Sequence, residues 1–457
     1  MRDNRPRSRS LESMTKNLTV TVSSEDELER LSAHTPVPGL VLIFAERRAC
    51  ARVFRLQGGP IELGRTELSL SDLLDSGISR RHVRFAYDGR TWQVLDLGSR
   101  NGTYVGARRS EGETRVPSGS VVRVGGSLLL TVADIVPFEQ HGLGISDGTV
   151  AGPSLRKALQ AVALTQSIGL SSSLMISGES GTGKEIAAKA FHAALGKPHA
   201  PFSAVNCATI PKDLAERLLF GSCRGAFSGA TDAKGHVQAA HGGTLFLDEV
   251  AELPLDVQSK LLRMLETREV LRLGATHYEQ VDVRVCAATW RNLREEVGAA
   301  RFREDLYFRV GQPEVRLPPL RERREEVPWH IQQLLDECSR EHPVSAAVTF
   351  VEACALRGWP GNVRELRAEV RRAAAVAIAR RSSVLSLDDL SATAGEPIGR
   401  AEPAANPASF PTDEVATALT AASGNVTRAA RELGIHRGKV RRWLERHAVD
   451  ASAFKPR

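Results

Sequence analysis

The sequence predicts a multidomain chain: an N-terminal β-sandwich, a central α/β domain with a helical lid, and a short all-α domain. Three observations predict this order. Short alternating apolar runs, separated by Gly, Asp and Asn turns, fill 40–136. Strand and helix patterns then alternate to about residue 320, which is typical of a mostly parallel sheet covered by helices. Beyond that point the patterns are helical and are interrupted by a Pro-rich segment.

Composition shifts place the domain boundaries. The 457 residues are enough for about three domains, each with its own core. We expect six segments in chain order: a flexible arm at 1–38, the sandwich at 39–136, a linker at 137–152, the α/β domain at 153–390 with its lid from about 325, a second linker at 391–411, and the last helical domain at 412–457.

Composition also excludes several classes of protein. A chain with 42% hydrophobic and 25% charged residues is not wholly disordered. Its longest apolar runs are far shorter than a bilayer span, and no apolar segment follows the N-terminal "MRDNRPRSRS", so we expect a cytoplasmic chain without a membrane partner. Six scattered cysteines without a CxxC pair indicate neither a zinc site nor a disulfide framework.

The central domain opens with a phosphate-binding loop. The stretch "MISGESGTGKEIAAKAFH" places a GxxxxGK pattern between an apolar strand and a helix, where backbone amides and the helix N-terminus surround phosphates and the lysine reaches the outer ones. Glu185 stands where the general pattern has Ser or Thr for magnesium. The expected nucleotide-binding residues are Gly178, Glu179, Ser180, Gly181, Thr182, Gly183, Lys184 and Glu185.

A second motif, "GGTLFLDEV", is an apolar strand that ends in two acids. Asp248 can hold Mg²⁺, and Glu249 can act as the general base toward the attacking water. An acidic strand end alone is usually a solvated turn, but the pairing with a phosphate loop about 65 residues upstream favours a Walker B element. The two motifs together predict an ATP-dependent protein.

The region 150–390 resembles the AAA+ domain of bacterial sigma-54-dependent transcription activators. The motifs that carry the resemblance are "GESGTGKE", "VNCATI", "GAFSGA", "GGTLFLDEV", "FREDLYFRV", "LPPLRERREEV" and "WPGNVREL". The phosphate loop of that family typically ends in Lys-Glu, which accounts for Glu185. The resemblance implies a homo-oligomeric ring, usually a hexamer, with ATP between neighbours and the sigma-54 RNA polymerase holoenzyme as partner.

The same resemblance assigns roles to further residues. Arg303 and Arg309 match the arginine fingers that a neighbouring subunit presents to the γ-phosphate. Arg364 matches the sensor II arginine of the lid, and Asn206 matches the asparagine that restrains the Walker B glutamate. Thr289 occupies the sensor I region.

Two positions depart from the family pattern. The loop "RGAFSGA" matches the GAFTGA element, in which Phe227 contacts sigma-54 while Gly225 and Gly229 let the loop move. Ser228 replaces the usual Thr there. Trp290 stands where sensor I usually has Asn. The alternative for Phe227 is an anchor that packs the loop.

The sandwich resembles the forkhead-associated (FHA) domain through "ELGRTE", "SGISRRH" and "LDLGSRNGTYV". This resemblance implies a phosphothreonine reader. Arg65, Ser79 and Arg80 match its phosphate contacts, Asn101 matches the residue that holds the peptide backbone, and His82 braces the loop from below. The implied partner is a phosphothreonine protein or a Ser/Thr kinase.

The C-terminal "GNVTRAARELGIHRGKVRRWLERH" resembles the Fis-type helix-turn-helix that ends this activator family. The segment from position 427 to 446 contains seven basic and two acidic residues, whereas the whole chain has a net charge of only +7. This concentration of charge favours DNA binding. The candidate DNA contacts are Arg428, His436, Arg437, Lys439, Arg441 and Arg442.

The sequence therefore predicts a regulator that hydrolyses ATP with Mg²⁺ to remodel the sigma-54 holoenzyme into the open promoter complex, under phosphothreonine control, from an upstream enhancer-like DNA site. Two alternatives stay open. One is an AAA+ DNA-binding regulator that does not engage sigma-54. The other is a phosphopeptide-dependent DNA-binding adaptor whose ATPase is vestigial.

Overall fold

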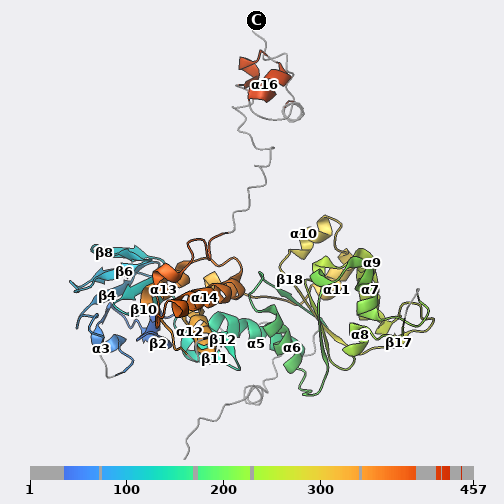
Figure 1. Cartoon of the computed structure of the whole chain (residues 1–457), viewed down its shortest axis with the longest axis horizontal. Helices are drawn as coiled ribbons and strands as arrows, with labels where there is room; N and C mark the ends of the chain where they lie inside the picture. Colours follow the sequence, from blue (N-terminus) through green and yellow to red (C-terminus); the bar gives the residue numbers. More distant parts are fainter. Residues whose placement is uncertain are drawn as a thin grey trace, which may run out of the picture. The chain divides into compact units, whose positions relative to one another are not determined.

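The computed structural model describes residues 35–71, 75–167, 173–226, 231–338, 342–397, 418–423, 425–432 and 444. The chain divides into two units, Met1–Glu396 and Pro397–Arg457, which we describe separately. The first unit contains the sandwich, the α/β domain and the lid (Figure 1). Within the described ranges, no helix combines the length and the apolarity that a bilayer span requires.

The N-terminal domain is a sandwich of two antiparallel sheets, as predicted. The six-stranded sheet has the order β2 (Arg48–Arg55), β1 (Gly39–Ala45), β10 (Ser127–Val132), β9 (Val121–Val124), β6 (Thr103–Val105) and β7 (Arg108–Arg109). The four-stranded sheet has the order β3 (Ile61–Leu63), β4 (Val83–Tyr87), β5 (Trp92–Asp96) and β8 (Glu113–Val116), with the short helix α3 (Arg65–Leu68) after β3.

Strand β1 is buried along its whole length. Leu40 and Leu42 point into the core between the two sheets, where Trp92 and Phe85 also lie. Its alternate residues belong to a different core, described below. Both faces of β1 are therefore covered, which explains why its sequence is continuously apolar rather than alternating.

The central domain contains a five-stranded parallel sheet. Its order is β14 (Phe202–Asn206), β15 (Thr244–Asp248), β18 (Arg284–Thr289), β13 (Ser173–Ser177) and β19 (Glu314–Arg316). Leu245 and Leu247 face one core and Phe246 faces the other, as period-2 alternation requires. The helices of this domain are α5 (Pro153–Ser167), α6 (Lys184–Ala193), α7 (Lys212–Phe220), α8 (His236–Ala239), α9 (Leu255–Thr267), α10 (Leu293–Gly298) and α11 (Glu304–Val310).

Shorter elements complete this domain. They are the strand pair β16 (Glu269–Val270) and β17 (Glu279–Gln280), and the 3₁₀ turns η1 (Cys207–Thr209), η2 (Val250–Glu252), η3 (Leu320–Glu322) and η4 (Arg324–Glu326).

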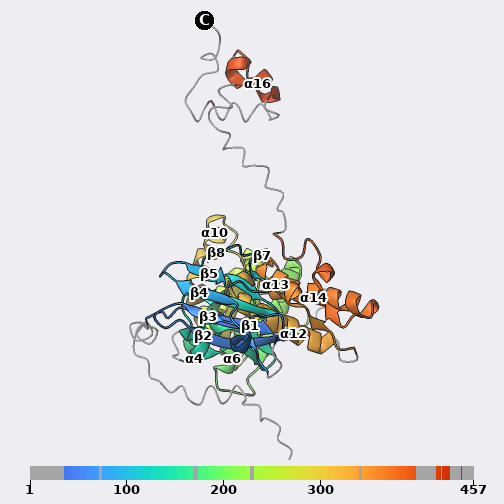
Figure 2. The same cartoon turned by 90° about the vertical axis from the view of Figure 1, so that its left-hand side faces the viewer.

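The lid consists of α12 (Val327–Cys338), α13 (Val348–Leu356) and α14 (Asn362–Ala379), with η5 (Leu387–Asp389) and a short parallel pair, β20 (Ser345–Ala346) and β21 (Val384–Leu385). The lid lies beside the six-stranded sheet of the sandwich (Figures 1 and 2). One continuous apolar core joins them, and its members include Val41, Ile43, Val121, Leu128 and Leu130 from the sandwich and Ile331, Leu334, Val351 and Cys354 from the lid.

The segment 137–152, expected to be a connecting loop, carries regular structure. Helix α4 (Val136–His141) is followed by a hairpin of β11 (Gly144–Ser146) and β12 (Thr149–Ala151). Its Gly and Asp residues supply the turn, since Asp147 and Gly148 both have positive φ. The hairpin leads directly into α5 and forms one wall of the nucleotide cavity described below.

In the second unit the described residues include α16 (Val426–Glu432). Asn425 precedes this helix, and its Oδ1 accepts hydrogen bonds from the backbone nitrogens of Thr427 (3.1 Å) and Arg428 (3.2 Å). The side chain thus satisfies two of the free amides at the helix start.

Candidate nucleotide and phosphopeptide sites

The predicted phosphate loop lies between β13 and α6. Gly181 and Gly183 have φ of +79° and +105°, which glycine adopts without strain. A Cβ on Gly181 would lie 2.3 Å from the carbonyl oxygen of Gly361 in the lid. Because α6 begins at Lys184, the amides of the loop gather at a helix N-terminus, where anions bind.

Lys184 joins this loop to the acidic end of β15. Its Nζ lies 3.1 Å from the Gly178 carbonyl oxygen and 3.1 Å from Oε1 of Glu249, and only 7% of the residue is exposed. Thr289 Oγ1 and the Trp290 backbone nitrogen each lie 3.4 Å from the other carboxylate oxygen of Glu249. The expected lysine, general base and sensor I threonine therefore meet at one point.

Asp248 lines the nucleotide cavity described below. Burial raises the pKa of its carboxyl, and nearby Lys184 opposes this effect. An oxygen ligand of this kind, placed beside a phosphate-binding loop, suits Mg²⁺, which binds through one or two carboxylates plus substrate phosphates. Glu185 is exposed and pairs with Lys189 at 2.8 Å. Position 185 therefore supplies no hydroxyl ligand for Mg²⁺. Asp248 is the carboxylate that fits this role.

The lid grips the phosphate loop through residues at the start of α14. Asn362 is fully buried, and its Nδ2 donates to the Ser180 carbonyl oxygen (3.0 Å) and to Oε2 of Glu179 (3.1 Å). Arg364 donates to Ser180 Oγ at 2.7 Å. Arg321 forms a bidentate ion pair with Glu179 at 2.7 and 2.8 Å. Lid position and loop conformation are therefore directly linked.

These groups surround a cavity of about 580 Å³, large enough for a nucleotide. The phosphate loop and the strand ends contribute Ser180–Ile186, Asn206, Asp248 and Glu249 to its lining. Arg323 on the N-terminal side of η4, the lid residues His330, Gln333, Val363, Arg364 and Arg367, and 148–150 of the β11–β12 hairpin complete it. Asn206 Oδ1 accepts from the Ala208 backbone nitrogen at 3.0 Å. The expected restraint of Glu249 by Asn206 stays a prediction.

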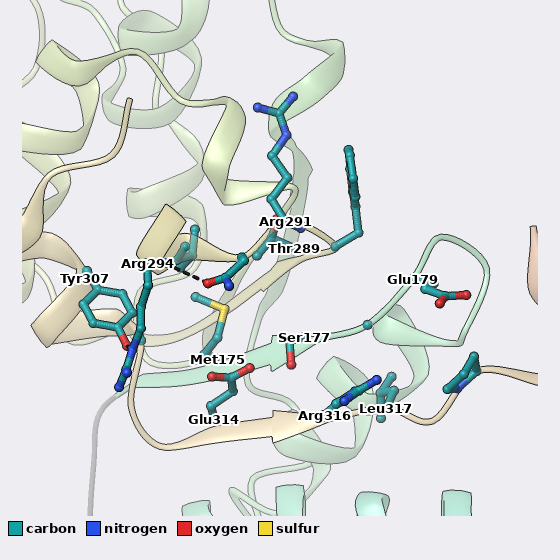
Figure 3. Close-up of a pocket in the computed structure, with 16 residues that line it drawn as sticks. Met175, Ser177, Glu179, Thr289, Arg291, Arg294, Tyr307, Glu314, Arg316 and Leu317 are labelled. Atoms are coloured by element: carbon teal, nitrogen blue, oxygen red, sulfur yellow. Dashed lines mark hydrogen bonds between the residues drawn. The ribbon is translucent and has the colours of Figure 1, made fainter. Parts of the chain in front are cut away.

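Figure 3 shows a second cavity, of about 410 Å³. Glu179 lines it at the phosphate loop, and Trp290 lines it with an indole ring near the Arg291 guanidinium, 5.5 Å from the ring centroid. Trp290 is 53% exposed. Its backbone nitrogen, rather than its side chain, therefore faces Glu249, so the departure from Asn at this position leaves a main-chain donor to the carboxylate.

Of the two candidate finger arginines, Arg303 directly precedes α11 and Arg309 lies within it, and neither is among the residues that line this chain's own nucleotide cavity. Arg303 forms a bidentate pair with Asp305 (2.6 and 3.0 Å) and donates to Ser259 Oγ at 2.9 Å; the bond to Asp305 raises the pKa of the guanidinium. Arg309 donates to the Leu265 carbonyl oxygen at 3.1 Å. This placement is compatible with a role toward another subunit.

Three of the four candidate phosphothreonine contacts come together at one end of the sandwich. Arg65 donates from its backbone nitrogen to the Ser79 carbonyl oxygen (3.0 Å) and from Nε to the Ile78 carbonyl oxygen (2.8 Å). Asn101 donates to the Gly77 carbonyl oxygen at 2.8 Å. Arg65 and Asn101, far apart in sequence, are thus both tied to the loop at 77–79.

His82 braces this loop, as expected. It is fully buried, its Nδ1 accepts from the Ser79 backbone nitrogen at 3.0 Å, and its Nε2 lies 3.3 Å from the Gly102 carbonyl oxygen. Burial lowers the pKa of the imidazole. Arg80, the fourth candidate contact, follows Ser79 and is exposed.

Two predicted contact sets lie largely outside the described residues. In the sigma-54 loop, Gly225 is described, with φ of +86°, and Ser222 pairs with Ala233 at the base of the loop. Phe227, Ser228 and Gly229 lie outside. Among the DNA-binding candidates Arg428 is described on α16, whereas His436, Arg437, Lys439, Arg441 and Arg442 lie outside.

Comparison with known protein families gives four matches along the chain. Residues 61–125 match the FHA domain, 151–316 the sigma-54 interaction domain, 321–406 the AAA+ ATPase lid domain, and 413–447 the bacterial regulatory protein family named after Fis. The order is that of the predicted domains. The central region of this chain is therefore a sigma-54 interaction domain with an AAA+ lid, between an FHA domain and a Fis-type domain.

Individual relatives agree with this assignment. The chain is 39% identical over 289 residues to the transcriptional regulatory protein GlrR of Escherichia coli, and 48% identical over 198 residues to the DNA-binding transcriptional regulator NtrC of the same species. The matches cover 62% and 42% of this chain, and 64% and 42% of the relatives, so the chain spans less than two thirds of each. A crystal structure of NtrX from Brucella abortus in complex with ATP is 29% identical, with a TM-score of 0.50, and the match covers 67% of this chain and 70% of that one.

The family assignment confirms the predicted fold class and the AAA+ ATPase class of the central domain. It leaves the individual residue roles as predictions. The sequence analysis missed Asn362 of the lid and Arg321 of η3 as groups that hold the phosphate loop, although both lie inside motifs that it quoted. Their role depends on the lid folding back over the loop, which local patterns do not show.

Proposed function

We propose that this chain hydrolyses ATP in a ring of identical subunits and uses the energy to remodel the sigma-54 RNA polymerase holoenzyme from the closed to the open promoter complex, while its C-terminal domain holds an upstream DNA site. The observation that carries this proposal is the ion pair between Lys184 and Glu249 inside the cavity, at 3.1 Å. It places the phosphate-binding cation and the candidate base within reach of one substrate.

The ion pair joins the phosphate-binding cation to the candidate base, because Lys184 Nζ lies 3.1 Å from Glu249 Oε1. Triphosphate oxygens compete for the ammonium, so binding frees the Glu249 carboxylate to accept a proton from the attacking water. Mg²⁺ held by Asp248 and the phosphates would neutralise part of the charge. Arg364 reaches the loop from the lid and would sense the outer phosphates.

In a ring of identical subunits, six of them as the family resemblance implies, each ATP site would receive an arginine guanidinium from the neighbouring subunit. Arg303, at the start of α11, and Arg309, within it, do not line their own cavity and would complete a neighbour's site in trans. A guanidinium beside the γ-phosphate stabilises transition-state charge. Hydrolysis should therefore depend on assembly.

We also propose that phosphothreonine bound to the FHA domain controls the lid. Arg123 on β9 pairs with Glu352 on α13 at 2.6 Å, and its guanidinium lies 3.8 Å from the ring centroid of Tyr104. Tyr104 follows the peptide-binding loop at Asn101 by three residues. A partner phosphoprotein or a Ser/Thr kinase that occupies Arg65, Ser79 and Arg80 could thus alter the lid through this chain of contacts.

Steady-state ATP hydrolysis by the full chain tests the proposal. Wild type should hydrolyse ATP with a rate per subunit that rises with protein concentration, whereas Lys184→Ala and Glu249→Gln should not. A phosphothreonine peptide should change the rate, and its unphosphorylated form should not. Absence of hydrolysis together with DNA binding would instead support the adaptor, and hydrolysis without promoter opening would support a regulator with another target.

A further inference from the structure

Three exposed arginines lie at the end of the sandwich that carries the candidate phosphothreonine contacts. The backbone nitrogen of Arg100 donates to Ser79 Oγ at 3.2 Å, which places Arg100 beside Ser79 and Arg80. Arg109 lies against Gly102, which follows the candidate peptide-backbone contact, because a Cβ on that glycine would come within 2.6 Å of Arg109 Nε. We call Arg80, Arg100 and Arg109 the arginine cluster.

The arginine cluster has no counter-charge in the described part of the chain, where no carboxylate forms an ion pair with any of its members. Two acids near it are bound within their own loops. Asp75 accepts from the backbone nitrogens of Gly77 (2.7 Å) and Gly126 (3.0 Å), and Asp96 accepts from Ser99 Oγ at 2.6 Å. An exposed group of unpaired positive charges favours an acidic ligand.

The N-terminal arm of this chain contains a threonine that is followed by an acidic run. In "TVSSEDELER", which begins at Thr21, the acids are Glu25, Asp26, Glu27 and Glu29. A phosphate on Thr21 would add a charge of about −1.5 to −2. The phosphorylated segment would therefore combine the phosphate that the site is predicted to bind with carboxylates that complement the arginine cluster.

The arm is long enough to reach this site within one chain. Its C-terminal end is fixed at Val37, whose backbone nitrogen donates to Asp134 Oδ1 at 3.2 Å. The ladders from β1 through β10 and β9 to β6 place the cluster near the Ala45 end of β1, about 25 Å from Val37 in an extended chain. The 16 residue steps from Thr21 to Val37 can span up to about 50 Å.

We propose that the FHA domain binds this chain's own N-terminal arm phosphorylated at Thr21, with Arg100 and Arg109 facing the acids at 25–27. This inference rests on the proposed phosphothreonine control and names a ligand for its site. The bound arm would occupy the same arginines that a partner phosphoprotein needs. Phosphorylation of Thr21 would thus close the site to other phosphoproteins.

Fluorescence anisotropy of labelled peptides that span residues 15–30 tests the proposal on the full chain. The peptide with phosphothreonine at position 21 should bind, and the unphosphorylated peptide should not. Replacing its acids at 25, 26 and 27 by the corresponding amides should weaken binding roughly tenfold, from about twofold for each exposed charge pair. In the double variant Arg100→Gln with Arg109→Gln, this ratio should fall to about one.

The matched control is Arg90→Gln. Arg90 is also exposed, and no ion pair joins it to a described residue. It lies in the turn between β4 and β5, at the opposite end of these strands from the arginine cluster, since Val83 pairs with Asp96 at the cluster end. Arg90→Gln should keep the tenfold ratio, and all variants should melt at the wild-type temperature.

A chain prepared with phosphothreonine at position 21 separates binding within one chain from binding between chains. Its own arm should exclude the labelled phosphopeptide even when the protein is dilute, because a tethered segment has an effective concentration of about 1 mM. If the peptide is excluded only at high protein concentration, the arm occupies a second copy, and binding within one chain is wrong.

Further outcomes would overturn the inference. Thr412 is followed by Asp413 and Glu414, so a phosphopeptide around it is the internal comparison, and tighter binding of that peptide would refute the choice of Thr21. Equal binding of the acidic and the amide phosphopeptides to wild type would refute the role of the arginine cluster. So would a double variant that loses DNA binding but keeps the peptide ratio.

A phosphothreonine peptide with only neutral neighbours distinguishes failure of this inference from failure of the proposed function. If that peptide binds and the phosphorylated arm peptide does not, only the assignment of the arm is wrong. If neither peptide binds, the proposed phosphothreonine control fails as well.

Discussion

Removing Arg123 should loosen the contact between the FHA domain and the lid. In the structure Arg123 Nε lies 2.6 Å from Glu352 Oε2, and the two side chains are only 15% and 3% exposed. Arg123→Ala leaves a buried carboxylate without its cation, which costs about 3 kcal/mol or more. Loss of the contact with Tyr104 adds about 0.5–1 kcal/mol.

Hydrogen exchange of β9 and α13 amides measures this cost locally, which matters because a multidomain chain does not unfold in a single two-state step. A loss of about 3 kcal/mol corresponds to roughly hundredfold faster exchange through local opening. The double variant Arg123→Met with Glu352→Leu removes both charges and should restore slow exchange. Arg115→Ala on the exposed edge of the sandwich is the matched control and should exchange like wild type. If Arg123→Ala changes exchange by less than threefold, the ion pair does not hold the two domains together in solution.

Three further predictions concern the ATPase and the buried acids. Glu249→Gln should bind ATP like wild type but lower kcat by about 10²–10⁴-fold, whereas Lys184→Ala should lose binding; equal binding by both variants in a titration would contradict these roles. Arg303→Ala should lower kcat by about 10³-fold or more, and mixing it with inactive Glu249→Gln should recover activity, because each kind of subunit supplies what the other lacks; no recovery in a mixed-ring assay would argue against trans fingers. Burial, with Glu326 nearby, raises the pKa of Glu325 from 4.5 to about 8. The folded chain therefore keeps a proton that the unfolded chain releases, and its stability should fall as pH rises from 4.5 toward 8, by at most about 1.4 kcal/mol per pH unit. Glu325→Gln should flatten this fall, and equal slopes in urea unfolding at pH 5.5 and 7.5 would refute the assignment.

The residues predicted for the nucleotide site lie close together because its main parts are strand-to-helix transitions. The glycines before Lys184 follow β13, and Asp248 and Glu249 stand at the end of β15, so the parallel sheet brings them together. The same reasoning placed Arg65 and Asn101 in segments that connect strands of the sandwich. These residues could be found without knowing how the domains pack.

Contacts between domains were harder to predict. Arg123 and Glu352 are 229 positions apart, and neither lies in a motif. One signal was present: the run "LVLIF" in β1 does not alternate, which indicates a strand covered on both faces.

The most direct test of the central claim is open-complex formation at a sigma-54 promoter with the purified chain and ATP, comparing wild type with Phe227→Ala. The account predicts that wild type opens the promoter, and that Phe227→Ala still hydrolyses ATP but fails to open it. If wild type hydrolyses ATP and leaves the promoter closed, or if Phe227→Ala opens it as well as wild type, remodelling of sigma-54 through this loop is wrong.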